Sequence, residues 1–179
     1  KECAMQHVLQ MNVIYDLETG DPDDLFAVLF LISHPSVNVR AVTITPGTLQ
    51  QVGAIKNLLF NKLNLPPNSV LVGSANPKHK KQCVASKIWN TLCGPIKEQQ
   101  PDGLGCDIIH QTISKYEDCV IVTGAPLTNL YNYVQKYCTE QGLQKYGKKK
   151  LTWICQGGFA GDNVVPKENR LRKFDGKTS

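Results

Sequence analysis

The sequence has no apolar run that approaches the roughly 18 residues needed to span a membrane, and no signal peptide is visible. It also has no internal repeat and no low-complexity segment. Its seven cysteines include no Cys-x-x-Cys pair, so a zinc site built from local pairs is not expected. Their odd number and irregular spacing favour a reducing compartment. We therefore predict a cytoplasmic protein that makes no membrane contact.

Positive charge is only slightly in excess. Lys and Arg total 20 against 15 Asp and Glu, which gives a net charge of +5. Many soluble enzymes carry as much, and the lysine clusters at 78–81 and 148–150 lie in expected loops without neighbouring aromatic platforms. Such clusters are typical of solvated turns, so no nucleic-acid partner is expected.

A single domain covering residues 1–179 fits the size and composition. The 179 residues are 41% hydrophobic and 20% charged, close to the averages of globular proteins. The chain begins with Lys1 rather than Met, so we expect that its N-terminus has been cut or lies inside a longer product. Residues after Gly157 are polar and contain no strand or helix pattern that would close the fold.

Apolar patterns alternate between strand and helix along the chain. Short apolar or alternating runs predict strands at 8–15, 37–45, 70–72, 119–123 and 151–155. Helices are predicted at 23–34, 50–63, 85–92, 106–116 and 127–138, and the rest of 73–105 is expected to be loop. Strands separated by helices pair in parallel through right-handed crossovers, so the predicted class is α/β with an open doubly wound, mainly parallel sheet. Such sheets bind ligands at the carboxyl ends of their strands.

The densest chemical signal follows the first predicted strand. Five of the fifteen acidic residues fall between Asp16 and Asp24. Part of the cluster has a structural explanation: Asp21 would cap the following helix, Pro22 would take the first helical position, and the next acids would favour the helix dipole. Helix capping together with surface charge is therefore one interpretation of the cluster. It does not explain Asp16 and Glu18, which leave the strand on the same side. Packed carboxylates repel unless a cation is present, so the other interpretation is a Ca²⁺ or Mg²⁺ site or a polyol site. An EF-hand is excluded, because its sixth position would be glycine and is Asp21 here.

Two further signals follow later strands. Residues 123–129 read TGAPLTN, which alone is typical of a tight strand-to-helix turn. Residues 157–163 read GGFAGDN, where glycines let the backbone approach a ligand and Asn163 can donate to and accept from hydroxyl groups. All three signals fall at strand ends of one predicted sheet.

Together these motifs resemble those of the inosine-uridine-type nucleoside hydrolases, which are Ca²⁺-dependent N-ribohydrolases. The acidic loop is similar to the family's DxDPGxDD motif, with one additional residue; its acidic positions are Asp16, Glu18, Asp23 and Asp24. Residues 123–129 are similar to the family's TGxLTN turn, 102–105 to its DGLG segment, and 157–163 to its later substrate loop. The resemblance covers nearly the whole chain. It implies the α/β fold and cleavage of a ribonucleoside to base and ribose.

The resemblance also implies a role for each matching residue. Asp24 would be the principal Ca²⁺ ligand. Glu18, which replaces an aspartate, would contact the metal and act as general base on its bound water. The carbonyl of Thr123 would complete the metal shell. Asp23 would hold ribose hydroxyls, and Asn163 would bind the sugar.

Asp16 would lie behind the metal ligands and orient the loop.

Two departures from the family's pattern bear on function. Thr48 stands where the family has an asparagine after the second strand, which changes a ribose contact. The family's chains are also considerably longer, and their C-terminal part supplies another metal-binding aspartate, a histidine that helps the base leave and further sugar contacts.

Two functions therefore stay open. As part of a longer protein, the chain would contribute to a Ca²⁺-dependent nucleoside hydrolase. As it stands, it would be a truncated or degenerate, non-catalytic module that binds ribose or nucleoside. A truncated sheet exposes apolar surface and an open edge, so we also expect self-association into a homo-oligomer.

Overall fold

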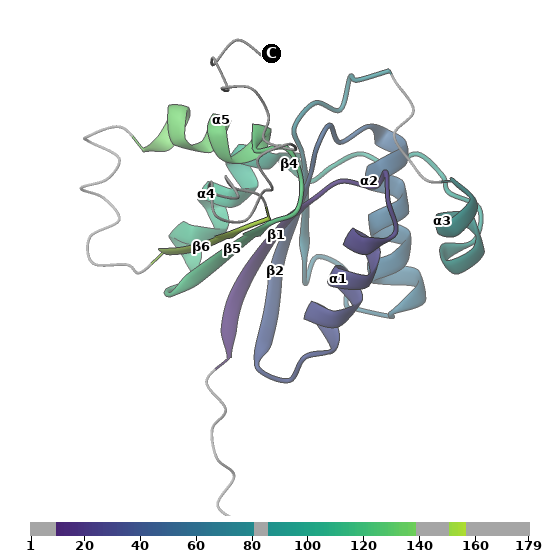
Figure 1. Ribbon diagram of the computed structural model, residues 1–179, viewed down its shortest axis with the longest axis horizontal. Coiled ribbons are helices and arrows are strands. Elements are labelled where there is room, and N and C mark those ends of the chain that lie inside the picture. The colour runs from purple at the N-terminus through teal and green to yellow at the C-terminus, as the bar shows by residue number, and fades with distance from the viewer. Residues whose placement is uncertain (1–9, 81–85, 139–150, 157–179) are drawn as a thin grey trace, which may run out of the picture.

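Six parallel strands form one open sheet at the centre of the molecule (Figure 1). The computed structural model describes residues 10–80, 86–138 and 151–156. The strands are β1 (Met11–Leu17), β2 (Val37–Ile44), β3 (Leu71–Ser74), β4 (Gly103–Leu104), β5 (Cys119–Thr123) and β6 (Leu151–Cys155). Their order is β4-β3-β2-β1-β5-β6, and every pairing is parallel. The chain thus winds outward from β1 in both directions, which confirms the predicted fold class.

Helices cover both faces of this sheet (Figure 1). They are α1 (Asp23–Ser33), α2 (Leu49–Lys56), its π-helical continuation η1 (Asn57–Lys62), α3 (Ser86–Cys93), α4 (Gly105–Lys115) and α5 (Thr128–Tyr137). α1, α2, η1 and α3 pack on one face, and α4 and α5 pack on the other. Among the described residues, no helix is both long enough and apolar enough to cross a lipid bilayer.

Strand β1 supplies both hydrophobic cores because successive side chains of a strand point to opposite faces. Tyr15 and Leu17 join the core beneath α1 and α2, whereas Ile14 joins the core beneath α4 and α5. All three are at most 3% exposed. Burial on both faces explains why β1 reads as a continuous apolar run, as expected for a central parallel strand.

The ten predicted elements are present, with ends shifted by a few residues. The first strand was predicted to begin at residue 8, which lies outside the described residues; the described strand extends to Leu17. The expectation of loop around residues 103 and 104 was wrong, because β4 pairs there with β3. The Asp102 carboxylate accepts the Val72 N–H at 2.7 Å and so fixes this edge. A two-residue strand is too short to leave a periodic pattern.

The opposite edge of the sheet, β6, is exposed along its whole length. Trp153 is 50% exposed and Ile154 is 55% exposed, and Phe30 on α1 is 65% exposed. Within the described residues no helix covers this strand. An exposed apolar edge of this kind is the physical basis on which self-association is proposed.

Gly53, inside α2, is expected to tolerate no side chain. A Cβ at this position would lie 1.9 Å from the carbonyl oxygen of Lys97, which belongs to a backbone segment crossing the helix. Alanine normally favours a helix over glycine by roughly 1 kcal/mol, but overpacking against backbone costs roughly 1–3 kcal/mol. We expect Gly53→Ala to lower the free energy of unfolding in urea, and Gln50→Ala in the same helix to change it by less than about 0.5 kcal/mol. A Gly53→Ala variant as stable as the parent would contradict this packing.

Candidate functional site

Three strands end side by side at the carboxyl edge of the sheet. Asp16 on β1 pairs with Thr43 on β2 and with Thr123 on β5. Beyond the strands, the N–H of Gly124 donates to the backbone carbonyl of Asp16 at 2.8 Å. The acidic loop and the TGAPLTN turn, about 100 residues apart in the chain, therefore meet at one place, as the strand-end rule predicts.

Asp16 is fully buried at this edge. Its Oδ1 accepts hydrogen bonds from Thr43 Oγ1 at 2.6 Å and from Asn129 Nδ2 at 2.8 Å. Its Oδ2 is buried and has no hydrogen-bond partner among the described residues. Burial raises the pKa of Asp16 to about 6, against the lowering effect of the two hydrogen bonds. The side chain is thus fixed behind the loop with one oxygen unsatisfied.

Asn129 anchors this buried carboxylate, and no role for it follows from the sequence pattern. Its Nδ2 also donates to Thr45 Oγ1 at 3.2 Å, so one amide joins α5 to β1 and to the end of β2. Because a carboxylate only accepts hydrogen bonds, the contact with Asp16 fixes which end of the amide is nitrogen. The final Asn of TGAPLTN is the only sequence signal that marks this position.

Asp24, in the first turn of α1, is only 4% exposed. Its Oδ1 accepts a hydrogen bond from the hydroxyl of Tyr15, and its Oδ2 accepts the backbone N–H of Glu18 at 2.9 Å. Burial is the largest cause of its raised pKa, and the charges of Asp23 and Asp21 act in the same direction. Burial and the Asp24 carboxylate likewise raise the pKa of Tyr15. Asp24 therefore lies inward of the loop, with both of its carboxylate oxygens accepting hydrogen bonds.

Glu18 is half-buried, and its carboxylate folds over Gly20. A Cβ on Gly20 would lie 3.2 Å from Glu18 Oε1. Burial raises the pKa of Glu18, and the nearby negative charge of Asp24 raises it further. A carboxylate with a raised pKa at the mouth of such a loop is suited to accept a proton.

The remaining acids of the loop, Asp21 and Asp23, are exposed. The expectation that Asp21 caps the helix was wrong, because the N-cap is Pro22 and no side chain makes a capping bond there. The carbonyl of Pro22 instead accepts the N–H of Phe26 and starts the helix one residue later. Asp23 is thus the first helical residue, with its carboxylate open to solvent.

Gly124 allows the β5 turn to approach Asp24. A Cβ on Gly124 would lie 2.5 Å from Asp24 Oδ1, 3.1 Å from the Tyr15 hydroxyl and 3.4 Å from Gln156 Oε1. The backbone N–H of Gln156 donates to the Thr123 carbonyl at 2.8 Å, which leaves that carbonyl one further lone pair. Gln156 follows directly on β6 and was not singled out from the sequence, since only its place at a strand end marks it.

Two predicted sugar contacts have different outcomes. Thr48 is buried and caps α2, because its Oγ1 accepts the N–H of Gln51 at 3.2 Å in a capping box. Gln51 Nε2 in turn donates to Thr19 Oγ1 at 2.9 Å, which ties this cap to the acidic loop. Asn163 lies outside the described residues, as does the rest of the GGFAGDN segment beyond Gln156.

The donor chemistry of this edge fits a hard cation. Glu18 and Asp24 offer carboxylate oxygens, and Asp16 holds an unsatisfied buried oxygen behind them. Within the described residues, the ion pairs are Lys56–Asp102 and Lys136–Asp107, so no basic side chain there forms an ion pair with the carboxylates of the acidic loop. The same residues do not bring three acidic side chains into ligating distance of one point. The described residues therefore do not by themselves form a complete metal site.

The chain is similar to known nucleoside hydrolases in both sequence and fold. The family model for the inosine-uridine preferring nucleoside hydrolases matches residues 13–154 of the chain. None of the curated protein sequences compared with the chain matches it. A solved plant nucleoside hydrolase, the PpNRh1 enzyme, is similar with 25% identity and a TM-score of 0.59. The match covers 83% of this chain and 48% of the plant protein.

Two further solved structures share the fold. The purine-preferring ribonucleoside hydrolase from Gardnerella vaginalis has 22% identity and a TM-score of 0.52, over 83% of this chain and 49% of that one. The effector protein XOO4466 has 14% identity and a TM-score of 0.60, over 92% of this chain and 48% of that one. The chain thus spans about half the length of the solved structures that it matches.

Proposed function

Because the chain belongs to the inosine-uridine preferring nucleoside hydrolase family, we propose that, as part of a longer protein, it hydrolyses the N-glycosidic bond of ribonucleosides to base and ribose in a Ca²⁺-dependent reaction. One observation carries the proposal. Glu18 and Asp24, both with raised pKa values, lie at the carboxyl edge beside the buried Asp16, and no cation of the described residues pairs with them. Such a cluster is stabilised by a divalent metal.

The proposed metal ligands are Glu18, Asp24 and the carbonyl of Thr123. Bound there, Ca²⁺ would lower the pKa of a coordinated water. Glu18 takes the proton of the attacking water, whose oxygen forms a bond to the anomeric carbon of the ribose. The C–N bond breaks, and its electron pair leaves with the base. Asp23, whose exposed carboxylate only accepts hydrogen bonds, holds ribose hydroxyls through this oxocarbenium-like state.

Thr48 and Asn163 remain proposed sugar contacts. The Thr48 hydroxyl already accepts a helix N–H, but it retains its own proton to donate. Asn163 is proposed on the resemblance of its loop alone. The proposed substrate class is therefore a ribonucleoside. Homo-oligomer formation is proposed from the exposed edge of the sheet, and a cytoplasmic location is proposed from the cysteine pattern.

The function is tested by ribose release from inosine and uridine by the longer protein, with Ca²⁺ and with a chelator. We expect release that stops in the chelator and returns when Ca²⁺ is restored. Release that continues unchanged in the chelator would reject metal dependence. Absence of release from every ribonucleoside, by protein shown to be folded, would reject the proposed activity.

The second candidate is a non-catalytic module that binds ribose or nucleoside. It is favoured by the observation that the described residues do not bring three acidic side chains into ligating distance of one point. For the 179-residue chain on its own we expect Ca²⁺ binding with little or no ribose release. Chelator-sensitive release that disappears in Asp24→Ala would show instead that these residues alone suffice for catalysis.

Gly124→Ala is expected to disable the metal site without removing a ligand. The new Cβ would lie 2.5 Å from Asp24 Oδ1, so the carboxylate must move away from the β5 turn. We expect Ca²⁺ affinity to fall at least about tenfold, measured by calorimetry. Gly103→Ala is the matched control, because its nearest contact is the flexible end of Ile108 at 3.3 Å. Equal Ca²⁺ affinity in Gly124→Ala and the parent would contradict this geometry.

A further inference from the structure

Tyr15 occupies a position in β1 that an apolar side chain could fill. It is only 3% exposed, and it belongs to the hydrophobic core beneath α1 and α2. Leu17, the next residue on the same face of the strand, and Leu25 on α1 fill this core without a polar atom. A buried hydroxyl is unfavourable unless it has a hydrogen-bond partner, so the packing of the core does not by itself explain the tyrosine.

The partner of this hydroxyl is Asp24. The Tyr15 hydroxyl donates to Asp24 Oδ1, and the Glu18 N–H donates to Asp24 Oδ2 at 2.9 Å. Because Asp24 is buried, these two donors, one from β1 and one from the acidic loop, fix the orientation of its carboxylate. An ionised carboxylate has about four lone-pair positions, so two hydrogen bonds leave each oxygen able to bind a cation as well.

Tyr15 also holds Asp24 close to the end of β5. In the parallel register Tyr15 pairs with Val122, one residue before Thr123. A Cβ on Gly124 would lie 2.5 Å from Asp24 Oδ1 and 3.1 Å from the Tyr15 hydroxyl oxygen, so these groups meet at one point. Thr123, whose carbonyl is a proposed metal ligand, directly precedes that glycine. The hydroxyl from β1 therefore joins a carboxylate on α1 to the turn that follows β5.

We propose that Tyr15 is a positioning residue of the metal site. Its hydroxyl holds the Asp24 carboxylate in the orientation in which α1 and the end of β5 serve a divalent cation together. The inference rests on the proposed function, because that function places Ca²⁺ at this edge. Tyr15 precedes the acidic-loop motif, which begins at Asp16, and it acts through Asp24 rather than by touching the metal.

Calorimetric titration of Ca²⁺ into Tyr15→Phe tests this role. Phenylalanine keeps the ring in the core and removes only the hydroxyl, so the variant is expected to fold. Groups that hydrogen-bond a metal-binding carboxylate typically change metal affinity by about 10- to 100-fold, so we expect at least about tenfold weaker Ca²⁺ binding than in the parent chain.

The near-ultraviolet absorption of tyrosine gives a second measurement. Metal binding at Asp24 draws electron density from Oδ1 and weakens its hydrogen bond with the Tyr15 hydroxyl. We therefore expect Ca²⁺ to produce a tyrosine difference spectrum in the parent chain, and the Tyr15 part of that signal to disappear in Tyr15→Phe.

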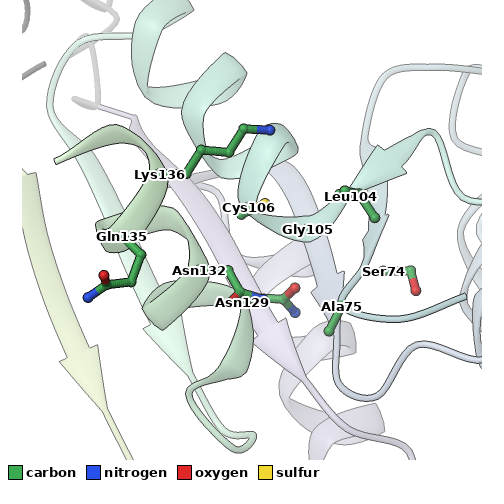
Figure 2. Close-up of a pocket in the computed structure, with 9 residues that line it drawn as sticks. All are labelled: Ser74, Ala75, Leu104, Gly105, Cys106, Asn129, Asn132, Gln135 and Lys136. Atoms are coloured by element: carbon green, nitrogen blue, oxygen red, sulfur yellow. The ribbon is translucent and has the colours of Figure 1, made fainter. Parts of the chain in front are cut away.

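Tyr137→Phe is the matched control, because the Tyr137 hydroxyl also donates to an aspartate, Asp107 Oδ1, at 2.8 Å. Tyr137 lies on α5, on the opposite face of the sheet from α1. Figure 2 shows this helix with Lys136, which forms an ion pair with the same aspartate. We expect the control to keep the parent's difference spectrum and its Ca²⁺ affinity within about twofold.

A double-mutant cycle in chelator tests the contact itself. Tyr15→Phe should lower the urea midpoint of the parent chain, because Asp24 loses a buried donor. In an Asp24→Ala background the same change should lower the midpoint far less, since the hydroxyl then has no carboxylate to hold.

Equal Ca²⁺ affinity in Tyr15→Phe and the parent, or a loss that Tyr137→Phe shares, would overturn the inference while leaving the metal site in place. Equal effects of Tyr15→Phe on stability in the two backgrounds of the cycle would overturn it as well. Absence of Ca²⁺ binding by the folded parent would reject the metal site together with the positioning role. Weaker Ca²⁺ binding in Tyr15→Phe, without ribose release by the longer protein, would support the inference and reject the proposed activity.

Discussion

Replacing Glu18 with glutamine is expected to slow Ca²⁺-dependent ribose release by the longer protein at least about a hundredfold. A positioned general base contributes about 10²–10⁴-fold to rate, and glutamine keeps the shape of the side chain while losing its basicity. Burial and the charge of Asp24 raise the pKa of Glu18, which makes its carboxylate a stronger base than an exposed glutamate. Initial rates at saturating inosine measure the effect.

The matched control for this substitution is Asp21→Asn. Asp21 lies in the same loop and carries the same charge, but it is exposed and is not a proposed ligand. We expect its loss to change the rate by less than about threefold, since screened surface charges act weakly. If Glu18→Gln retains the parent rate at every pH, another group is the base.

The second large effect is on stability. In the absence of divalent cations, the free energy of unfolding is expected to fall by about 2 kcal/mol between pH 4 and pH 7. Burial raises the pKa of Asp16 from 3.8 to about 6, and a pKa that is higher by one corresponds to about 1.36 kcal/mol, part of which is already lost at pH 4. Between those pKa values the folded chain holds a proton that the unfolded chain has released, so folding weakens as the pH rises. The raised pKa values of Glu18 and Asp24 act in the same direction.

Urea denaturation in chelator at several pH values measures this dependence, and Asp16→Asn is the diagnostic variant. Asparagine keeps the Oδ1 acceptor for Thr43 and Asn129 but has no charge to titrate, so most of the slope should disappear. Asp107, whose pKa is lowered, stabilises the folded chain when it is ionised. This stabilising contribution is lost only below about pH 4, so it does not affect the slope measured between pH 4 and pH 7. Stability that rises from pH 4 to pH 7 would contradict the burial of an ionisable Asp16.

The fold was largely predictable because its strands and helices are long enough to show their periods. The central strand β1 follows directly from an apolar run that is buried in the structure, and the helix α1 follows from an apolar run of helical length that is buried only in part. The strand β4 was not predictable, because two residues carry no period. The helix start at Pro22 was missed because Asp21 is a strong capping type, yet the structure uses no side-chain cap there.

The site was predictable where chemistry repeats along the chain and hidden where it depends on distant contacts. Crowded carboxylates mark Glu18 and Asp24 in the sequence itself. Asn129 becomes meaningful only when α5 brings it to Asp16, 113 positions away. Gln156 reaches the Thr123 carbonyl only because β6 pairs with β5. Pairings between segments so far apart leave no local pattern that spacing rules can detect.

The most direct test of the proposed metal site is calorimetric titration of Ca²⁺ into this chain at pH 7, beside Asp24→Asn. Neutralising Asp24 removes a buried ligand charge while keeping its hydrogen-bond acceptor for Glu18. We expect one Ca²⁺ bound per chain, a rise in unfolding free energy of about 2.7 kcal/mol at about 100 times the Kd, and loss of both in Asp24→Asn. Absence of Ca²⁺ binding by the folded chain, or binding of equal strength in Asp24→Asn, would contradict the assignment of this edge as a metal site.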